Sequence, residues 1–390
     1  MKRRLVILTE IISPYRIPLF NTLARNAEVD LHVIFLAETD PMLRQWRVYK
    51  DEIQFSYQVL PSWRQRLGPY NMLLNHGVAR ALAASAPDVI LCGGYNYVAS
   101  WQALWWARAR EIPFVLWSES NGKDLRRGYA VVEFLKSSFL RKCSGFVVPG
   151  RAAQEYVCAD KKVGEAELFT APNAVDNDLF AAGASAAREN AAALRRKLDL
   201  PGRYFLFTGR LVREKGVFEL LSAYAKLTES LRQQVGLVLV GDGVSRRQLE
   251  AQAAAISPGA IKFAGFAQRE QLAIYYGLAE ALVLPTYTDT WGLVVNEAMA
   301  CGLPVILSEA AGCAPELIRE NWNGLLVPPR DVPSLAFAMR SLAERPDLCI
   351  TMGANSAKHI AHYSPNEWSS GIARMVEATA GRVLISGPQT

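Results

Sequence analysis

The sequence predicts an α/β protein built from two Rossmann-like domains that face each other across a cleft. The chain has 390 residues, which is more than one typical hydrophobic core organises. Short apolar runs of buried-strand type alternate with helical patterns in two separate series along the chain. Between the two series, residues 181–195 are rich in alanine and contain almost no large apolar side chain. Together these observations indicate two parallel sheets covered by helices.

The first domain is expected to span residues 1–175. Pro14 and Pro18 accompany a helical pattern at 17–25, and a second predicted helix carries Trp101 and Trp105. Apolar runs predict the strands of this domain at residues 5–9, 31–36, 88–92, 114–117 and 146–149. Short apolar strands separated by helices pair in parallel and form a doubly wound sheet.

The second domain is expected at residues 203–365, after an inter-domain linker at 176–202. Residues 366–390 include an amphipathic helical pattern at 367–379, which we expect to return toward the first domain. Sheets of this kind bind ligands beyond the carboxyl ends of their strands, so the loops there carry the candidate site residues. The strands of the second domain are predicted at residues 204–208, 236–240, 261–264, 281–285, 305–307 and 324–327.

The net charge of +6 arises entirely in the N-terminal part of the chain. Residues 1–170 contain 22 basic and 16 acidic side chains, whereas residues 171–390 contain 21 of each. This bias fits a solvated surface, or attraction to an anionic membrane or a phosphate-bearing acceptor. The sequence shows no pattern of a nucleic-acid binder. Basic side chains gather at Lys2-Arg3-Arg4, Arg44/Arg47/Lys50, Arg64/Arg66 and Lys123/Arg126/Arg127.

The composition predicts a cytoplasmic protein, with peripheral contact at the inner membrane surface as an open alternative. No apolar run reaches the roughly 18 residues of a membrane span, and the apolar stretch near the N-terminus is too short for a signal peptide. The six cysteines form no C-x-x-C pair, so we expect free thiols in a reducing compartment. The four histidines lack partners at ligand spacing, and we expect no metal site.

The richest segment for chemistry is 284–305, where a buried strand leads through a loop into a helix. Asp289 and Gly292 lie in this loop, and the helix is expected to begin near Leu293 and to stop at Gly302. Free N–H groups at the helix start would form an anion site. Asp289 at the helix mouth and Glu297 about one turn inside it could accept pairs of hydroxyl donors from one ligand. The alternatives are a helix-terminal charge for Asp289 and a solvated position for Glu297.

A second segment, 207–216, connects the first strand of the second domain to a helix. Arg210 and Lys215 are donors on this loop, Gly209 opens it, and Gly216 eases its final turn. Two cations at this place could hold a diphosphate and stabilise it as it departs. Arg213 in the same loop is better explained as a solvated side chain.

Two further loops follow strands of the second domain and are less specific. Gly241 belongs to V-G-D-G at 240–243, and Phe266 follows the strand at 261–264. Each loop could be an ordinary turn or could contact the base of a nucleotide.

The motifs of the C-terminal half resemble those of the retaining glycosyltransferases of family 4. The run G-R-L-x-x-x-K-G at 209–216 is followed by D-x-W-G-L-V-V-N-E-A-M-A-C-G-L-P-V at 289–305 and N-G-L-L-V-P-P at 323–329. In the N-terminal half, S-P-Y-R-I-P-L-F at 13–20, W-S-E-S-N at 117–121 and P-N-A-V-D at 172–176 are similar to segments of the same family. The resemblance therefore extends over nearly the whole chain.

This resemblance implies a GT-B architecture in which the second domain holds a nucleotide-sugar donor without a metal or other cofactor. It implies that Arg210 and Lys215 contact the donor diphosphate and that Glu297 binds the ribose. It assigns Tyr15 and Arg16 to the acceptor side. The transferred sugar would contact Asp289 and the backbone N–H groups of Gly292, Leu293 and Val294.

The chain departs from the family pattern at three places. Asp289 replaces the usual glutamate and is one methylene shorter, which could change donor choice. The glycine-rich loop that commonly follows the first strand is missing at residues 9–12. Trp117-Ser118-Glu119 stands where many members have a histidine, and Glu119 could act near the sugar or be structural.

The expected function is sugar transfer, with retention of anomeric configuration, from a UDP- or GDP-sugar to a glycan, lipid-linked or other hydroxyl acceptor. We expect a role in cell-surface polysaccharide or glycoconjugate biosynthesis. A nucleotide-sugar epimerase of the same fold and a non-catalytic nucleotide-sugar-binding subunit are the alternatives. The lack of a G-x-G-x-x-G turn after the first strand argues against a dehydrogenase.

Overall fold

The computed structural model describes residues 2–40, 45–67, 70–122, 130–159, 167–256 and 259–380. These residues form two compact units. The first contains the described residues up to 173 together with 365–380, and the second contains 174–364. Five members of the predicted basic clusters fall outside this description, either entirely or as side chains: Arg44, Arg66, Lys123, Arg126 and Arg127.

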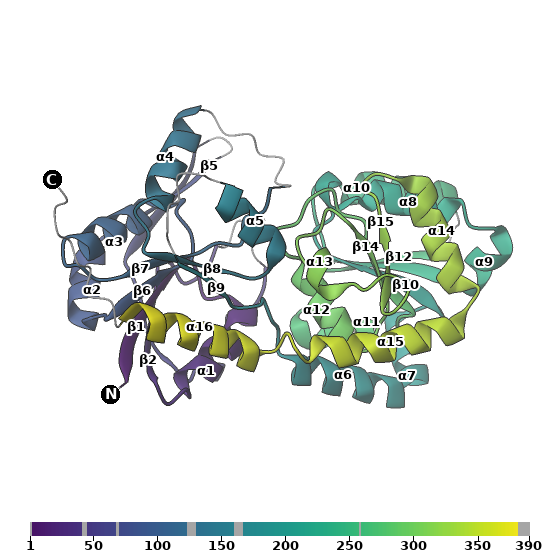
Figure 1. The fold of residues 1–390 in the computed structure, drawn as a ribbon. Helices are drawn as coiled ribbons and strands as arrows, with labels where there is room; N and C mark the ends of the chain where they lie inside the picture. The colour runs from purple at the N-terminus through teal and green to yellow at the C-terminus, as the bar shows by residue number, and fades with distance from the viewer. Residues whose placement is uncertain are drawn as a thin grey trace. The chain divides into compact units, whose positions relative to one another are not determined.

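The first unit contains a seven-stranded sheet in which all neighbouring strands pair in parallel (Figure 1). Every residue of the three strands β6, β7 and β8 is buried, as expected for parallel strands covered on both faces. The strands, in sheet order, are β3 (Ser56–Val59), β2 (Val29–Phe35), β1 (Arg3–Thr9), β6 (Val89–Cys92), β7 (Phe114–Trp117), β8 (Gly145–Val148) and β9 (Glu167–Thr170).

Helices cover this sheet, and one of them comes from the end of the described chain. The last helix, α16 (Pro365–Ala380), lies beside α1 in the first unit (Figure 1). Trp368 of α16 is fully buried, and its ring centroid lies 5.7 Å from Phe20 and 5.3 Å from Trp117. The other helices of this unit are α1 (Ile17–Ala24), α2 (Val78–Ser85), α3 (Val98–Arg108), α4 (Ala130–Leu140) and α5 (Arg151–Ala159).

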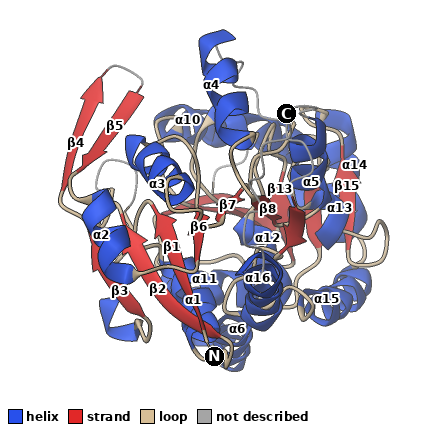
Figure 2. Ribbon diagram, turned by 60° about the vertical axis from the view of Figure 1, so that its left-hand side comes forward, coloured by secondary structure: helices blue, strands red, loops and turns tan. Residues whose placement is uncertain are grey.

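A two-stranded antiparallel hairpin, which the sequence did not predict, stands apart from the large sheet of the first unit. It consists of β4 (Ser62–Leu67) and β5 (Tyr70–Asn75), and β5 lies beside α3 (Figure 2). Short 3-10 turns occur at Pro14–Arg16 and Lys50–Glu52. In the ranges that the structure describes, none of the helices has both the length and the apolar composition needed to span a bilayer.

The second unit contains a six-stranded parallel sheet with helices on both faces. The strands, in sheet order, are β12 (Ile261–Gly265), β11 (Gly236–Val240), β10 (Tyr204–Thr208), β13 (Ala281–Leu284), β14 (Val305–Ser308) and β15 (Gly324–Val327). Its helices include α8 (Val217–Ala225), α9 (Glu229–Gln234), α10 (Arg246–Ile256), α11 (Arg269–Leu278), α12 (Leu293–Ala300), α13 (Ala314–Leu317), α14 (Val332–Ala343) and α15 (Pro346–Ile360).

The region expected to be a linker, 176–202, instead forms part of the second unit. It folds into α6 (Asn177–Glu189), which Asp176 caps, and α7 (Ala191–Leu198). Phe180 of α6 is buried in the core of this unit. The small side chains of α6 let it approach α11 so closely that a Cβ added to Gly183 would lie 2.7 Å from the Cβ of Ala273. Helix packing through small residues explains why the stretch has few large apolar side chains.

The strand order of each sheet reverses at one point. In the second unit, the chain moves outward from β10 through β11 to β12 and then returns to β13 on the other side of β10. In the first unit, β1 and β6 are the corresponding neighbours. Loops that follow strands on the two sides of such a reversal diverge and leave room for a ligand. The loops after β10 and β13 are therefore the expected location of a ligand site in the second unit.

Candidate functional site

The loops after β10 and β13 are joined to one another by the backbone of Glu214. Its carbonyl accepts a hydrogen bond from the Thr286 hydroxyl at 3.0 Å and another from the Tyr287 N–H at 2.8 Å. Gly216 has a φ of +69°, and a Cβ added there would lie 2.0 Å from the carbonyl oxygen of Pro285. Only glycine fits this close approach, so the position of Lys215 is fixed relative to residues 285–289.

Lys215 and Asp289, predicted separately as diphosphate and sugar ligands, form a direct ion pair. The Lys215 Nζ and the Asp289 Oδ2 are 2.5 Å apart, and the two side chains are only 18% and 16% exposed. The Asp289 carbonyl accepts a hydrogen bond from the Gly312 N–H at 3.0 Å, which holds the loop against the segment after β14. The pair therefore occupies a defined position between two strand ends.

The mouth of α12 is shaped by a glycine and a buried tryptophan. Gly292 occupies the N-cap with a φ of +101°, and no side chain among the described residues caps this helix start. The first-turn N–H groups, including those of Leu293 and Val294, are therefore available to an anion or a hydroxyl oxygen. The Trp291 indole donates to Asn296 Oδ1 at 2.9 Å and anchors the loop inside the core. As predicted, Gly302 ends the helix with a φ of +74°.

Glu297 lies on α12 and accepts a hydrogen bond of 2.7 Å from the Tyr276 hydroxyl of α11. Burial raises the pKa of the Glu297 carboxyl to about 7, and the hydrogen bond from Tyr276 opposes this rise. The raised pKa favours the protonated form of this carboxyl more than in an exposed glutamate. Sequence reasoning missed Tyr276, because it is one of two adjacent tyrosines in an apolar helical pattern and nothing distinguishes it from a core residue.

The raised pKa of Glu297 predicts that stability falls with increasing pH. Between the unfolded value of 4.5 and about 7, the folded protein retains a proton that the unfolded chain has lost. The free energy of unfolding should therefore decrease across this window, by on the order of 3 kcal/mol in total. Glu297→Gln stays neutral at every pH and should remove this decrease. Urea unfolding of both proteins at about pH 5 and about pH 8 measures it, and equal pH dependence in the two would contradict the assignment.

Gly209 and Gly241 lie where the loops after β10, β11 and β12 pack on one another. The Gly209 N–H donates to the Val240 carbonyl at 3.0 Å, and the Gly241 N–H donates to the Gly265 carbonyl at 2.7 Å. Gly241 has a φ of +136°, and a Cβ there would lie 1.9 Å from the carbonyl oxygen of Gly209. Close packing of backbone thus requires a glycine at position 241, whatever ligand the loops bind.

Arg210 and Phe266, both predicted to contact the donor, are exposed on these loops. Arg210 makes no side-chain hydrogen bond or ion pair with the described residues, so its charge remains available to a ligand. Phe266 is exposed directly after β12, where its ring can stack on a planar group. Arg213 is exposed too, and its guanidinium lies 5.4 Å from the ring centroid of Phe218.

In the first unit, the structure brings Tyr15, Arg16 and Glu119 together at the carboxyl ends of β1 and β7. Arg16 donates to the Thr9 hydroxyl at 2.9 Å, and its Nη2 lies 3.5 Å from Glu119 Oε1. Its guanidinium stacks on the Trp117 ring at 4.3 Å and lies 5.9 Å from the ring of Tyr15. Glu119 therefore holds Arg16 in place.

A neighbouring polar cluster was not found from the sequence. Arg64 of β4 pairs with the buried Asp40, and its Nη2 lies 3.5 Å from Glu10 Oε1. A side-chain hydrogen bond to Glu10 contributes to the raised pKa of the Tyr97 phenol, for which burial is the main cause. The partners of Arg64 are 24 and 54 residues away in sequence, so no local pattern could have indicated them.

Both units match the models of known protein families. A profile described as Glycosyltransferase Family 4 matches residues 19–179, and one described as Glycosyl transferases group 1 matches residues 191–359. The chain belongs to glycosyltransferase family 4. This membership confirms the resemblance seen in the motifs at 209–216 and 289–305, both of which lie inside the second match.

Curated relatives of this family 4 chain match about half of its length. A D-inositol 3-phosphate glycosyltransferase of Corynebacterium jeikeium is 32% identical over 216 residues, which are 53% of this chain and 50% of that protein. The chain spans about half the length of the curated relatives it matches.

Solved structures resemble the whole chain in fold. Sucrose-phosphate synthase from Thermosynechococcus elongatus has a TM-score of 0.72 at 22% identity, covering 96% of this chain and 99% of that chain. The Anabaena protein HepE in complex with UDP-glucose has a TM-score of 0.72 at 19% identity, covering 96% and 100%. The two parallel α/β sheets of this family 4 protein are those of the predicted GT-B class.

Proposed function

We propose that this protein is a retaining glycosyltransferase that moves a sugar from a nucleoside diphosphate sugar to a hydroxyl group of an acceptor. The observation that carries the proposal is the convergence of the Lys215–Asp289 ion pair, the exposed Arg210 and the uncapped start of α12 on adjacent strand ends. Cations and free N–H groups suit a diphosphate, and the carboxylate suits sugar hydroxyls. Membership of family 4 supports the same activity.

A UDP-sugar is the donor we propose. The HepE structures were determined with UDP or UDP-glucose, and another neighbour of similar fold was bound with UDP-2-fluoro glucose.

In our proposal Arg210 and Lys215 bind the diphosphate, and Glu297 accepts hydrogen bonds from the ribose hydroxyls. Phe266 stacks on the base, while the loops of Gly209 and Gly241 provide backbone around it. Asp289 and the N–H groups of Gly292, Leu293 and Val294 hold the transferred sugar.

The chemical step follows from these assignments. The bond between the anomeric carbon and the phosphate oxygen breaks, and the acceptor oxygen bonds to the same face of the sugar. The departing phosphate oxygen takes the acceptor proton, so no separate base is required. Lys215 and Arg210 stabilise the negative charge that develops on the leaving diphosphate, and this is the main catalytic contribution. Asp289 already holds Lys215 before the donor binds, which reduces the reorganisation needed.

On the acceptor side, we propose that Tyr15 and Arg16 contact a glycan or lipid-linked acceptor through its hydroxyl groups. Glu119 then acts as a positioning residue, since it reaches the acceptor through Arg16. Arg16 and Arg64 are each paired with carboxylates, and the Glu10 and Glu119 side chains remain about a third exposed. Exposed carboxylates accept hydrogen bonds from hydroxyls, which favours a hydroxyl-bearing group over a phosphate at this place.

The test begins with calorimetric titration of the full chain with UDP-, GDP-, ADP- and dTDP-glucose. We expect the UDP-sugar to bind most tightly and Arg210→Ala to weaken that binding. Product analysis with the preferred donor, with and without a panel of sugar acceptors, then identifies the reaction. Sugar conversion without an acceptor would instead favour the epimerase, and donor binding without turnover would favour the binding subunit. Because we propose no metal, EDTA should leave turnover unchanged.

A further inference from the structure

We propose that the outer surface of α4 and the adjoining end of α3 dock on an anionic lipid membrane. This α3–α4 surface is defined by six side chains of the first unit: Trp105, Arg108, Phe134, Leu135, Arg141 and Lys142. The proposal does not depend on the proposed function, because it concerns residues that no part of the donor or acceptor site uses.

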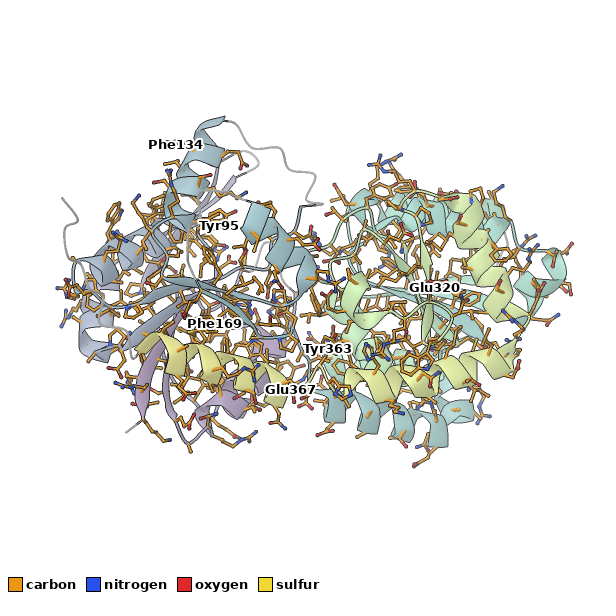
Figure 3. All side chains as sticks on the ribbon, in the orientation of Figure 1. Tyr95, Phe134, Phe169, Glu320, Tyr363 and Glu367 are labelled. Atoms are coloured by element: carbon orange, nitrogen blue, oxygen red, sulfur yellow. The ribbon has the colours of Figure 1, made fainter. Side chains whose placement is uncertain are left out.

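The inner side of α4 is firmly anchored, which determines what the outer side presents. Phe139 is fully buried, and its ring centroid lies 4.9 Å from Trp101 of α3 and 6.0 Å from Tyr95. In Figure 3, Phe134 is labelled beside α4 near the upper edge of the first unit, and Tyr95 is labelled below it, toward the body of the unit. Phe134 is 64% exposed and Leu135 is also exposed. Because α4 is anchored by Phe139, the exposed Phe134 and Leu135 side chains form a defined apolar surface on a folded helix.

Two basic side chains, Arg141 and Lys142, directly follow the C-terminal end of α4. Positions 134, 138, 141 and 142 recur at helical spacing, and the Lys142 ammonium donates back to the Ser138 hydroxyl at 3.1 Å. Arg141 is exposed beside it. At a rise of about 1.5 Å per residue, Phe134 is roughly 9 Å from the last residue of α4, Leu140, and Arg141 and Lys142 follow immediately. The apolar side chains and the cations are therefore close enough to meet one bilayer surface together.

The end of α3 extends this surface. The Lys142 ammonium lies 5.5 Å from the ring centroid of the exposed Trp105, and Arg108 donates to the Lys142 carbonyl at 3.3 Å. Arg110 follows, stacked on Trp106 at 4.4 Å. In the described part of this region, the exposed cations Arg108, Arg110 and Arg141, together with the partly exposed Lys142, outnumber the exposed carboxylates of Glu111 and Glu133. Glu133 lies 3.4 Å from Lys136.

An anionic bilayer matches this chemistry better than other occupants. Tryptophan and phenylalanine favour the membrane interface, where the ring is in the acyl boundary and cations contact the lipid headgroups. Each lysine or arginine near an anionic surface adds an attraction of its own, which salt weakens. The basic excess of residues 1–170, against a neutral remainder, places the long-range attraction on this half of the chain.

The experiment is co-sedimentation of the full chain with vesicles of phosphatidylcholine alone or mixed with phosphatidylglycerol. We expect binding to the mixed vesicles that decreases with added salt, and little binding to phosphatidylcholine. The double variant Phe134→Ser/Leu135→Ser should lower the partition coefficient at least about tenfold, and Arg141→Glu about fivefold or more. The matched control is Phe337→Ser/Ile350→Ser, which removes two exposed apolar side chains, 63% and 76% exposed, from the second unit.

Far-UV circular dichroism and urea unfolding show that each variant is folded, and neither measurement depends on the proposed donor. Equal binding of all variants to the mixed vesicles would overturn the proposal, as would equal binding to both vesicle types. Absence of vesicle binding combined with self-association that the Phe134/Leu135 variant abolishes would also overturn it, by assigning the surface to a second copy of the chain.

Discussion

Replacing Lys215 by alanine is expected to lower kcat by a factor of about 10²–10³. Lys215 is the cation best placed to stabilise the leaving diphosphate, because Asp289 holds its ammonium at 2.5 Å and the preceding Glu214 carbonyl accepts hydrogen bonds from Thr286 and Tyr287. Its charge matters most when the leaving group gains negative charge, so the loss should affect kcat more than the KM for the donor. Initial rates at saturating donor measure the effect, with the donor and acceptor that the titration and product analysis identify.

Arg213→Ala is the matched control for this substitution. Arg213 lies two residues earlier in the same loop and is exposed, with its guanidinium against Phe218 rather than toward Asp289. Removing it deletes an equal charge from the same loop and should change kcat less than about threefold. Near-normal kcat in Lys215→Ala, or equal losses in both variants, would contradict the role proposed for Lys215.

Much of the fold could be predicted from the sequence, because its parallel strands are buried on both faces. The strands at 114–117, 204–208, 236–240 and 324–327 were predicted with the observed bounds. Such strands are continuous apolar runs, which differ clearly from the helices between them. The hairpin of β4 and β5 is different, since it mixes apolar and polar residues and takes its position from contacts with distant segments.

The candidate site in the second unit was predictable for a related reason. Most of its residues come from two short segments, 209–216 and 289–302, and each segment begins in the loop that follows a strand, so sequence position determines their location. Their roles toward a donor stay predictions. What the sequence could not provide was the pairing within the site: the ion pair of Lys215 joins residues 74 apart, and Tyr276 reaches Glu297 from another helix. Such contacts depend on how helices pack, which no local pattern encodes.

The alanine-rich region 176–202 shows the opposite error, in which composition suggested a linker where a packed element exists. Large apolar residues are one means of burying a helix, but small ones allow another, since backbones then approach directly. Gly277 of α11 demonstrates this, because a Cβ there would lie 2.8 Å from the Cα and carbonyl oxygen of Ala184. The stretch is poor in large side chains because its neighbour leaves no room for them.

Gly216→Ala is expected to be the most destabilising of the substitutions considered, lowering the free energy of unfolding of the second unit by about 3 kcal/mol or more. The new Cβ would lie 2.0 Å from the Pro285 carbonyl oxygen, which is backbone and cannot rotate aside. The positive φ of +69° adds its own cost for any residue with a side chain. Relieving the clash requires the loops after β10 and β13 to separate, and that separation would also break the contact between Lys215 and Asp289.

Gly302→Ala distinguishes the clash from the backbone conformation. Its φ of +74° nearly equals that of Gly216, but an added Cβ would meet nothing closer than 3.8 Å. This control should therefore lose only the conformational part, about 1–2 kcal/mol. Urea unfolding followed by tryptophan fluorescence compares the two variants, with Trp291 reporting on the second unit. If both variants lose the same stability, the loops can separate without cost, and the ion pair of Lys215 is not held in position by Gly216.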